Sequence, residues 1–216
     1  MEDNMKVLIE PGIGEYEEKK SRFIATVAKV SSEEEAIAFV NEMKKKYWDA
    51  RHNCMAYIIG EKREIMRFSD DGEPQGTAGK PILDVLIGSK ATNIAIVVTR
   101  YFGGVLLGTG GLVRAYQKSS QDAIANSVLA DKCRGYSVTI CTDYNGFGKI
   151  QYLAATEGVD IMDTEYTDVV TITVVAEEEP YHKFKSKAIE STAGKALFEE
   201  EEKVEFYKTQ SGVTIC

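Results

Sequence analysis

The sequence lacks any apolar run long enough to span a membrane. A membrane helix needs roughly 20 consecutive apolar residues, and the longest candidate, residues 94–99, has only the length of a strand. Residues 1–4, Met-Glu-Asp-Asn, also lack the basic and apolar regions of a secretory signal. These absences argue against membrane and secreted proteins, and we expect a cytoplasmic protein.

Metal-ligating residues are few. The 216 residues include four cysteines and two histidines, and no two cysteines form a Cys-x-x-Cys pair. Neither His52 nor His182 has a cysteine at zinc-ligand spacing. We therefore expect free thiols, no structural metal and no cofactor.

The motifs of common hydrolases and nucleotide-binding enzymes are also missing. The chain has no Ser-x-x-Lys, no Gly-x-Ser-x-Gly and no Gly-Lys-Ser/Thr, and its glycine spacing differs from the dinucleotide fingerprint. No nucleophile is recognisable, so the sequence favours a binding protein over an enzyme.

Positive charge is scarce overall but is unevenly distributed. The formal net charge is −8, which argues against a general nucleic-acid coat. Residues 51–118 nevertheless carry nine basic and six acidic side chains, whereas residues 119–216 carry nine and 17. An RNA contact would therefore have to involve the middle of the chain.

Hydrophobic periodicity predicts two consecutive α+β domains, residues 1–130 and 135–216, with a linker at about 130–135. In the first domain we expect strands at 22–30, 54–60, 64–68 and 93–102, and helices from a capping box at Ser31–Glu35 to about 46, from Pro81, and at 111–129. In the second we expect strands at 136–142, 159–166, 169–176 and 203–207, and helices at 146–157 and 180–192. The β-α-β-β-α-β order of the second domain is the ferredoxin-like arrangement.

The first candidate site is an acidic loop, SDDGEPQGTAGKP at residues 69–81. Asp70, Asp71 and Glu73 have the hard oxygen ligands that a divalent cation prefers, and burial of one carboxyl would favour acid–base chemistry. The alternative interpretation is a tight turn, in which Asp70 and Asp71 accept backbone hydrogen bonds and Gly72 supplies a positive φ.

The second candidate site is a glycine-rich loop, VVTRYFGGVLLGTGGLVRAY at residues 97–116. Backbone amides exposed by glycines at a helix N-terminus form a natural anion site, and arginines add charge-assisted contacts to a phosphate. The residues assigned to this site are Gly103, Gly104, Gly110, Gly111, Arg100 and Arg114, with Arg51, His52 and Lys80 as nearby polar contacts. The alternative is that the glycines are architectural and permit close backbone packing.

The same loops resemble the YigZ/IMPACT family. SDDGEPxGTAGKP and VVTRYFGGxxLGTGGLVRAY match together with SRFI at 21–24, AxHNCxAY at 50–57 and AYxxG at 56–60. The resemblance is specific over about residues 19–128 and rests on element order over 136–208.

The resemblance implies a fold and a cellular context. The first domain would be like the second-domain fold of a small-subunit ribosomal protein, also seen in domain IV of elongation factor G. The second would be similar to domain V of that factor. Eukaryotic members restrain a translation-initiation kinase by competing for its activator protein. The first-domain fold is also shared with small-molecule kinases.

Three functional hypotheses follow. The leading one is a translation-associated protein that recognises RNA or a ribosomal surface through the first domain. The second is a phosphate- or metal-handling enzyme that uses residues 70–73 and the glycine loop at 103–111. The third is a protein-interaction module that binds a protein partner. None of the three involves a membrane.

Overall fold

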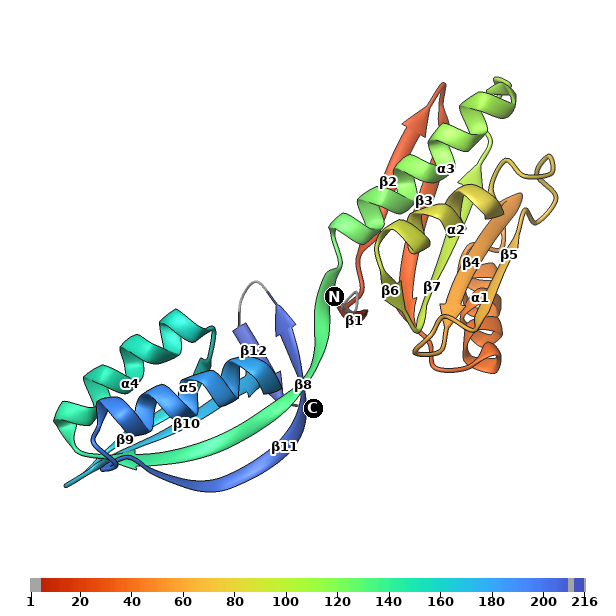
Figure 1. Ribbon diagram of the computed structural model, residues 1–216. Coiled ribbons are helices and arrows are strands. Elements are labelled where there is room, and N and C mark those ends of the chain that lie inside the picture. The colour runs from red at the N-terminus through yellow and green to blue at the C-terminus, as the bar shows by residue number, and fades with distance from the viewer. Residues whose placement is uncertain (1–4, 210–211, 216) are drawn as a thin grey trace. The chain divides into compact units, whose positions relative to one another are not determined.

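The computed structural model describes residues 5–209 and 212–215. The chain divides into two compact units, Met1–Asp131 (unit 1) and Lys132–Cys216 (unit 2). Both units combine helices with a largely antiparallel sheet, as expected for an α+β protein (Figure 1). No helix among the described residues combines the length and apolarity needed to cross a membrane.

Unit 1 is built on a five-stranded antiparallel sheet with the strand order β2-β3-β7-β4-β5. Its elements are β1 (Lys6–Glu10), β2 (Ile13–Glu18), β3 (Ser21–Lys29), α1 (Glu33–Lys46), β4 (His52–Ile59), β5 (Ile65–Ser69), α2 (Gly79–Gly88), β6 (Ala91–Thr92), β7 (Ile94–Tyr101), α3 (Gly108–Ala125) and the start of β8 (Val128–Thr142). The short strand β1 pairs with β6 and with the start of β8.

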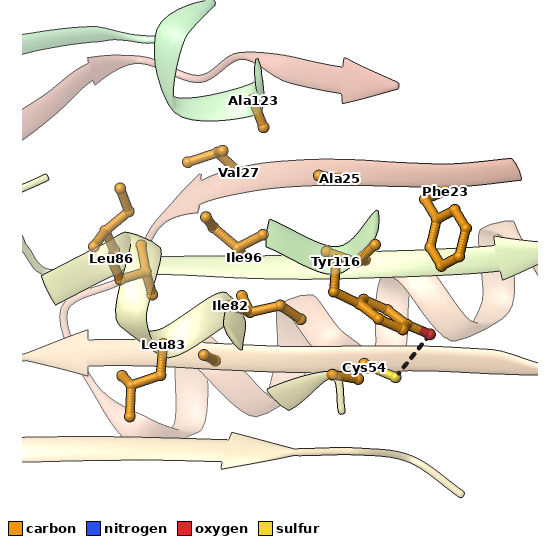
Figure 2. Packing of buried hydrophobic residues seen from close by; sticks show 14 of the residues in the cluster. Phe23, Ala25, Val27, Cys54, Ile82, Leu83, Leu86, Ile96, Tyr116 and Ala123 are labelled. Carbon is orange, nitrogen blue, oxygen red and sulfur yellow. Dashed lines mark hydrogen bonds between the residues drawn. The ribbon is translucent and has the colours of Figure 1, made fainter. Parts of the chain in front are cut away.

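Alternation along the strands gives the sheet two apolar faces. Cys54, Ala56 and Ile58 of β4 belong to the larger core, which α2 and α3 cover. Tyr57 and Ile59 point to the other face, where α1 packs. Figure 1 shows α2 and α3 over one face of this sheet. Figure 2 shows the larger core, in which Tyr116 of α3 points toward Cys54 on β4.

The capping box predicted at the start of α1 is confirmed. Ser32 is the N-cap residue, and its Oγ accepts a hydrogen bond from the Glu35 backbone amide at 3.3 Å. The Glu35 carboxylate accepts one in return from the amide of Ser31 at 2.7 Å. Two amides that the helix leaves without partners are thereby satisfied.

Unit 2 has the predicted β-α-β-β-α-β order, extended by a C-terminal strand. Its elements after β8 are α4 (Tyr144–Glu157), β9 (Asp160–Tyr166), β10 (Val170–Glu177), α5 (Glu178–Ser191), β11 (Leu197–Thr209) and β12 (Gly212–Ile215). The strand order is β9-β10-β8-β11-β12. The core lies between this sheet and the helices α4 and α5, and includes Tyr181 and Phe184 of α5.

The structure differs from the sequence-based expectation around residues 126–135. The third helix ends at Ala125 instead of 129, and the expected linker at 130–135 lies within the 15-residue strand β8. Residues 128–131 pair with β1 and residues 135–142 pair with β10, so strand pairing keeps the whole segment extended. The strands β1, β2, β6 and β12 were not predicted.

Candidate functional site

The register of the unit 1 sheet brings its functional loops to one edge. Arg22 at the start of β3 pairs with Tyr101 at the end of β7, and Arg100 pairs with His52 at the start of β4. Met55 in turn pairs with Ser69 at the end of β5. Four segments therefore lie at the same end of the strands, which we call the loop edge. They are the turn at 19–20, the turn at 47–51, the acidic loop (69–78) and the glycine loop (102–108).

Asp70 organises the acidic loop through backbone amides. Its carboxylate accepts hydrogen bonds from the amides of Gly76 (2.8 Å), Ala78 (3.0 Å) and Gly79 (2.8 Å). Ala78 is the N-cap residue of α2 and has no capping side chain of its own. Asp70 thus supplies the acceptor that the first turn of α2 would otherwise lack.

Asp71 ties the acidic loop to α1 and β4. One carboxylate oxygen accepts a hydrogen bond from the Asn53 amide at 2.7 Å, and the other lies 2.7 Å from Lys44 Nζ. The Asp71 carbonyl oxygen lies 2.8 Å from His52 Nδ1. With Asp71 at φ +43° and Gly72 at φ +85°, the segment has the tight turn that the second interpretation predicted.

Glu73 leaves the acidic loop and enters the core. Its Oε1 lies 2.6 Å from Arg100 Nη1 and accepts a hydrogen bond from the Tyr116 hydroxyl at 2.8 Å. The side chains of Glu73 and Arg100 are only 3% and 7% exposed. This ion pair joins the acidic loop to β7, and Tyr116 joins both to α3.

Cys54 completes the buried network. Its Sγ lies 3.3 Å from the Tyr116 hydroxyl and 3.0 Å from the Asp70 carbonyl oxygen. Burial raises the pKa of both the Cys54 thiol and the Tyr116 hydroxyl. A thiol that keeps its proton at neutral pH is a poor nucleophile.

Asp70, Asp71 and Glu73 are the metal ligands that the sequence offered as candidates. Asp70 accepts backbone amides, Asp71 pairs with Lys44 and Glu73 pairs with Arg100, so the three carboxylates have separate partners. Among the described residues, no group of three or more histidine, cysteine, aspartate or glutamate side chains is arranged to hold a metal ion.

Arg100 lies inside unit 1 and not on its surface. Its guanidinium carbon is 5.4 Å from the centre of the Phe23 ring and 5.6 Å from that of Phe102, distances typical of cation–π contacts. Its Nε is buried and has no hydrogen-bond partner among the residues that the structure describes. Arg100 therefore contacts the glycine loop from the core side, through the Phe102 ring.

The glycines of the glycine loop and of the first turn of α3 are of three kinds. Gly103 is required by packing, because a Cβ there would lie 2.1 Å from the backbone carbon of Lys20. Gly104 and Gly108 have positive φ angles of 85° and 70°. A Cβ at Gly110 would meet only Arg114 Nη1, at 3.6 Å, and one at Gly111 would lie 3.0 Å from the Leu107 side chain.

The first turn of α3 lies at this loop, and its first backbone amides have no partner within the helix. No side chain caps the helix, and its first turn has no acidic residue. The contact with the Gly110 position shows that the exposed Arg114 side chain folds back over this turn. Positive helix-end potential and an arginine therefore coincide at an exposed surface.

The remaining predicted residues border this surface. Arg51 is exposed at the start of β4, and His52 beside it is half-buried against the acidic loop. Lys80 is exposed on α2 and forms an ion pair with Asp84. The buried partners Tyr116 and Asn53 and the exposed Trp48 were not predicted, because only the fold brings them to the loop edge.

The chain matches known proteins over both units. Residues 19–124 match the Impact N-terminal domain, and residues 141–195 match a domain of unknown function, DUF1949. The chain is 38% identical to IMPACT family member YvyE of Bacillus subtilis, over 89% of each chain. It is 37% identical to IMPACT family member YigZ of Escherichia coli, over 82% of this chain and 87% of YigZ.

A crystal structure of a hypothetical protein with 35% sequence identity is also similar. Its TM-score is 0.58, over 90% of this chain and 95% of that one. Because relatives above 35% identity match nearly from end to end, these findings confirm the resemblance that the loop motifs indicated. The chain belongs to the IMPACT family.

Proposed function

We propose that this chain is a translation-associated regulatory protein that binds RNA, free or on the ribosome, through the loop edge of unit 1. One observation carries the proposal: the three carboxylates of the acidic loop have internal partners, whereas basic side chains around them are exposed. The exposed basic residues are Lys19, Lys20, Lys45, Lys46, Arg51 and Arg114. An excess of exposed positive charge at one edge attracts a polyanion.

Within this proposal, the residues divide into two roles. Arg51, Lys80 and Arg114, with the backbone amide at Gly110, contact phosphates directly. The residues Arg100, His52, Gly103 and Gly104 hold the two loops in place, together with Asp70, Asp71 and Glu73. A surface that is fixed before binding loses less conformational entropy when the ligand arrives.

Family membership supports the link to translation. The eukaryotic members are implicated in restraining a translation-initiation kinase, as the resemblance described above implies. The β-α-β-β-α-β order of unit 2 also agrees with the proposed likeness to domain V of elongation factor G. We extend the same proposal to unit 1 and domain IV of that factor. Fold alone does not fix function, so the loop edge carries the main argument.

A protein-interaction module is the second candidate, and one feature of the glycine loop favours it. Phe102, Val105 and Leu106 are 46%, 47% and 82% exposed. Exposed apolar residues gathered within one loop are typical of a protein contact. The two candidates differ in their salt dependence, because only the phosphate contacts release counterions.

The test is RNA binding measured as a function of salt. Fluorescence anisotropy with labelled single-stranded RNA gives a dissociation constant at each salt concentration, and the slope of log K against log [salt] counts the phosphate contacts. We expect Arg114→Ala to weaken binding and to reduce the slope by about 0.7, the value for one phosphate on a single strand.

The matched control is Lys183→Ala, which removes one exposed charge from unit 2. It should leave both affinity and slope unchanged. An Arg114→Ala slope equal to that of the wild type would contradict the assignment of Arg114. If the chain binds a protein partner, and this binding changes neither with salt nor after nuclease treatment, the interaction module is favoured instead.

A further inference from the structure

The chain's single tryptophan, Trp48, is 82% exposed. It lies in the turn between α1 and β4, where the Ala50 amide donates a hydrogen bond to the Tyr47 carbonyl at 3.0 Å. Tryptophan is highly buried on average, because its large ring contributes more apolar area than most other side chains. An indole left almost entirely in water does not contribute to the core of unit 1.

Basic residues flank Trp48 on both sides. Lys44, Lys45 and Lys46 form the last turn of α1, and Arg51 follows the tryptophan by three residues. Lys45, Lys46 and Arg51 are exposed, whereas Lys44 is paired with Asp71. An exposed aromatic ring among cations has the composition of a surface that stacks a base and binds the adjoining phosphates.

Two contacts hold this turn against the candidate site. Lys44 Nζ lies 2.7 Å from the Asp71 carboxylate of the acidic loop. The Tyr101 hydroxyl donates a hydrogen bond to Asp49 at 2.9 Å, and Tyr101 directly precedes the glycine loop. Asp49, next to Trp48, is exposed and accepts this hydrogen bond from a neutral hydroxyl, and the turn is continuous with the loop edge.

We infer that Trp48 is a stacking platform for an unpaired base of single-stranded RNA, with Lys45, Lys46 and Arg51 at the flanking phosphates. This inference rests on the proposed function and names its substrate class. Bases in a duplex are already stacked on their neighbours, so an exposed indole selects for a single strand. The flanking cations favour a polyanion over an apolar or basic protein partner.

Because Trp48 is the only tryptophan among eleven tyrosines, the tryptophan emission, excited selectively, reports on this position alone. We would titrate the full chain with a uridine oligomer of about 12 nucleotides, within the usual range of single-strand site sizes. An RNA duplex of the same length is the comparison. The single strand should quench and shift the tryptophan emission at low salt, and the duplex should not.

Variants separate stacking from charge. Measured by anisotropy with the labelled oligomer, Trp48→Ala should bind about 5- to 150-fold more weakly, the range that stacking of one base spans. Trp48→Phe should stay within about threefold of the wild type, because it keeps an aromatic face. Tyr152→Ala, which removes a 71% exposed ring from unit 2, should change nothing.

Because Trp48 is exposed, its substitution should change the stability of the fold little. Equal melting temperatures of the wild type and the variants would confirm this. Unchanged affinity of Trp48→Ala for a single strand that the wild type binds would overturn this inference and leave the proposed function intact. Tighter binding of the wild type to the RNA duplex than to the single strand would likewise overturn this inference and leave the proposed function intact. If ribosomes change the tryptophan emission, and the change persists after complete nuclease digestion of their RNA, Trp48 contacts a protein surface instead. Absence of any RNA binding by the wild type would overturn both proposals.

Discussion

Glu73 and Arg100 form a buried ion pair, with Glu73 Oε1 and Arg100 Nη1 2.6 Å apart and both side chains more than nine-tenths buried. The pair joins the acidic loop to the end of β7, 27 residues further along the chain. Tyr116 donates a hydrogen bond to the same carboxylate oxygen. The acidic loop and the glycine loop are thus held together from inside the unit, and their outer surfaces remain available for a ligand.

Removal of Glu73 should destabilise unit 1 strongly. Glu73→Ala leaves the Arg100 guanidinium buried without its counter-ion, and breaking a buried pair in this way costs about 3–5 kcal/mol. Urea unfolding at neutral pH measures the loss. The double variant Glu73→Leu with Arg100→Met replaces the charges by apolar groups of similar size and should recover most of the stability. A loss below about 1 kcal/mol for Glu73→Ala would contradict the role of the pair.

Asp70 should matter for stability through its three amide contacts. In Asp70→Ala the amides of Gly76, Ala78 and Gly79 lose their acceptor, and we expect the free energy of unfolding to fall by about 1–2 kcal/mol, as for a lost helix cap. Asp84→Ala, which removes an exposed carboxylate from α2, is the control and should cost less than about 0.5 kcal/mol.

Thermal unfolding with added divalent cations tests the metal hypothesis. Because the three carboxylates have separate internal partners, magnesium or calcium should not raise the melting temperature of the wild type. A metal-dependent rise that disappears in Asp71→Asn would show that the acidic loop binds a cation after all.

The pH dependence of stability should reveal the buried thiol. Burial raises the pKa of Cys54 above its ordinary value of 9.0, so above that pH the unfolded chain loses a proton that the folded chain keeps. The unfolded state then binds fewer protons, and stability falls with rising pH by up to about 1.4 kcal/mol per pH unit. Below about pH 9 this contribution is fully present.

Comparison with Cys54→Ala isolates this effect. Its unfolding free energy should fall less steeply than that of the wild type between about pH 9 and pH 10, before Tyr116 adds its own contribution. Urea unfolding across this range measures both slopes. Parallel curves for the two proteins would contradict the assignment.

Local sequence patterns were sufficient to predict most of the elements but not the contacts between the loops. The alternation in β4 and the serine–glutamate cap of α1 depend on neighbouring residues, so the sequence indicates them directly. The Glu73–Tyr116 contact joins residues 43 positions apart, and no periodicity encodes it. The end of α3 was misplaced because β8 is extended by pairing with β1, which itself was not predicted.

The sequence also predicted which charged residues lie in the two loops, but not which of them are buried. The sequence places Asp70, Asp71, Glu73 and Arg100 in adjacent motifs, but their chemistry depends on burial. Glu73 and Arg100 point into the core, whereas the carboxylate of Asp70 turns back to its own loop. Only the fold distinguishes these positions from the exposed Arg114.

Gly103 should be essential for folding and not for binding itself. A Cβ at this position would lie 2.1 Å from the Lys20 backbone, so Gly103→Ala forces the β2–β3 turn away from the glycine loop. We expect a loss of at least about 1–3 kcal/mol in unfolding free energy, the range for overpacking at a tight site. Unchanged stability would show that the loop moves freely and would weaken the description of a fixed surface.

Gly110 should behave in the opposite way, and it separates architecture from function. It lies in the first turn of α3, and a Cβ there would meet only the Arg114 side chain at an ordinary 3.6 Å. Gly110→Ala should therefore leave stability unchanged or raise it by up to about 1 kcal/mol, because alanine favours a helix. RNA affinity should nevertheless fall, since the added methyl group lies where a phosphate would approach the backbone amides. A variant that is at least as stable as the wild type and binds RNA equally well would place the phosphate contacts elsewhere on the loop edge.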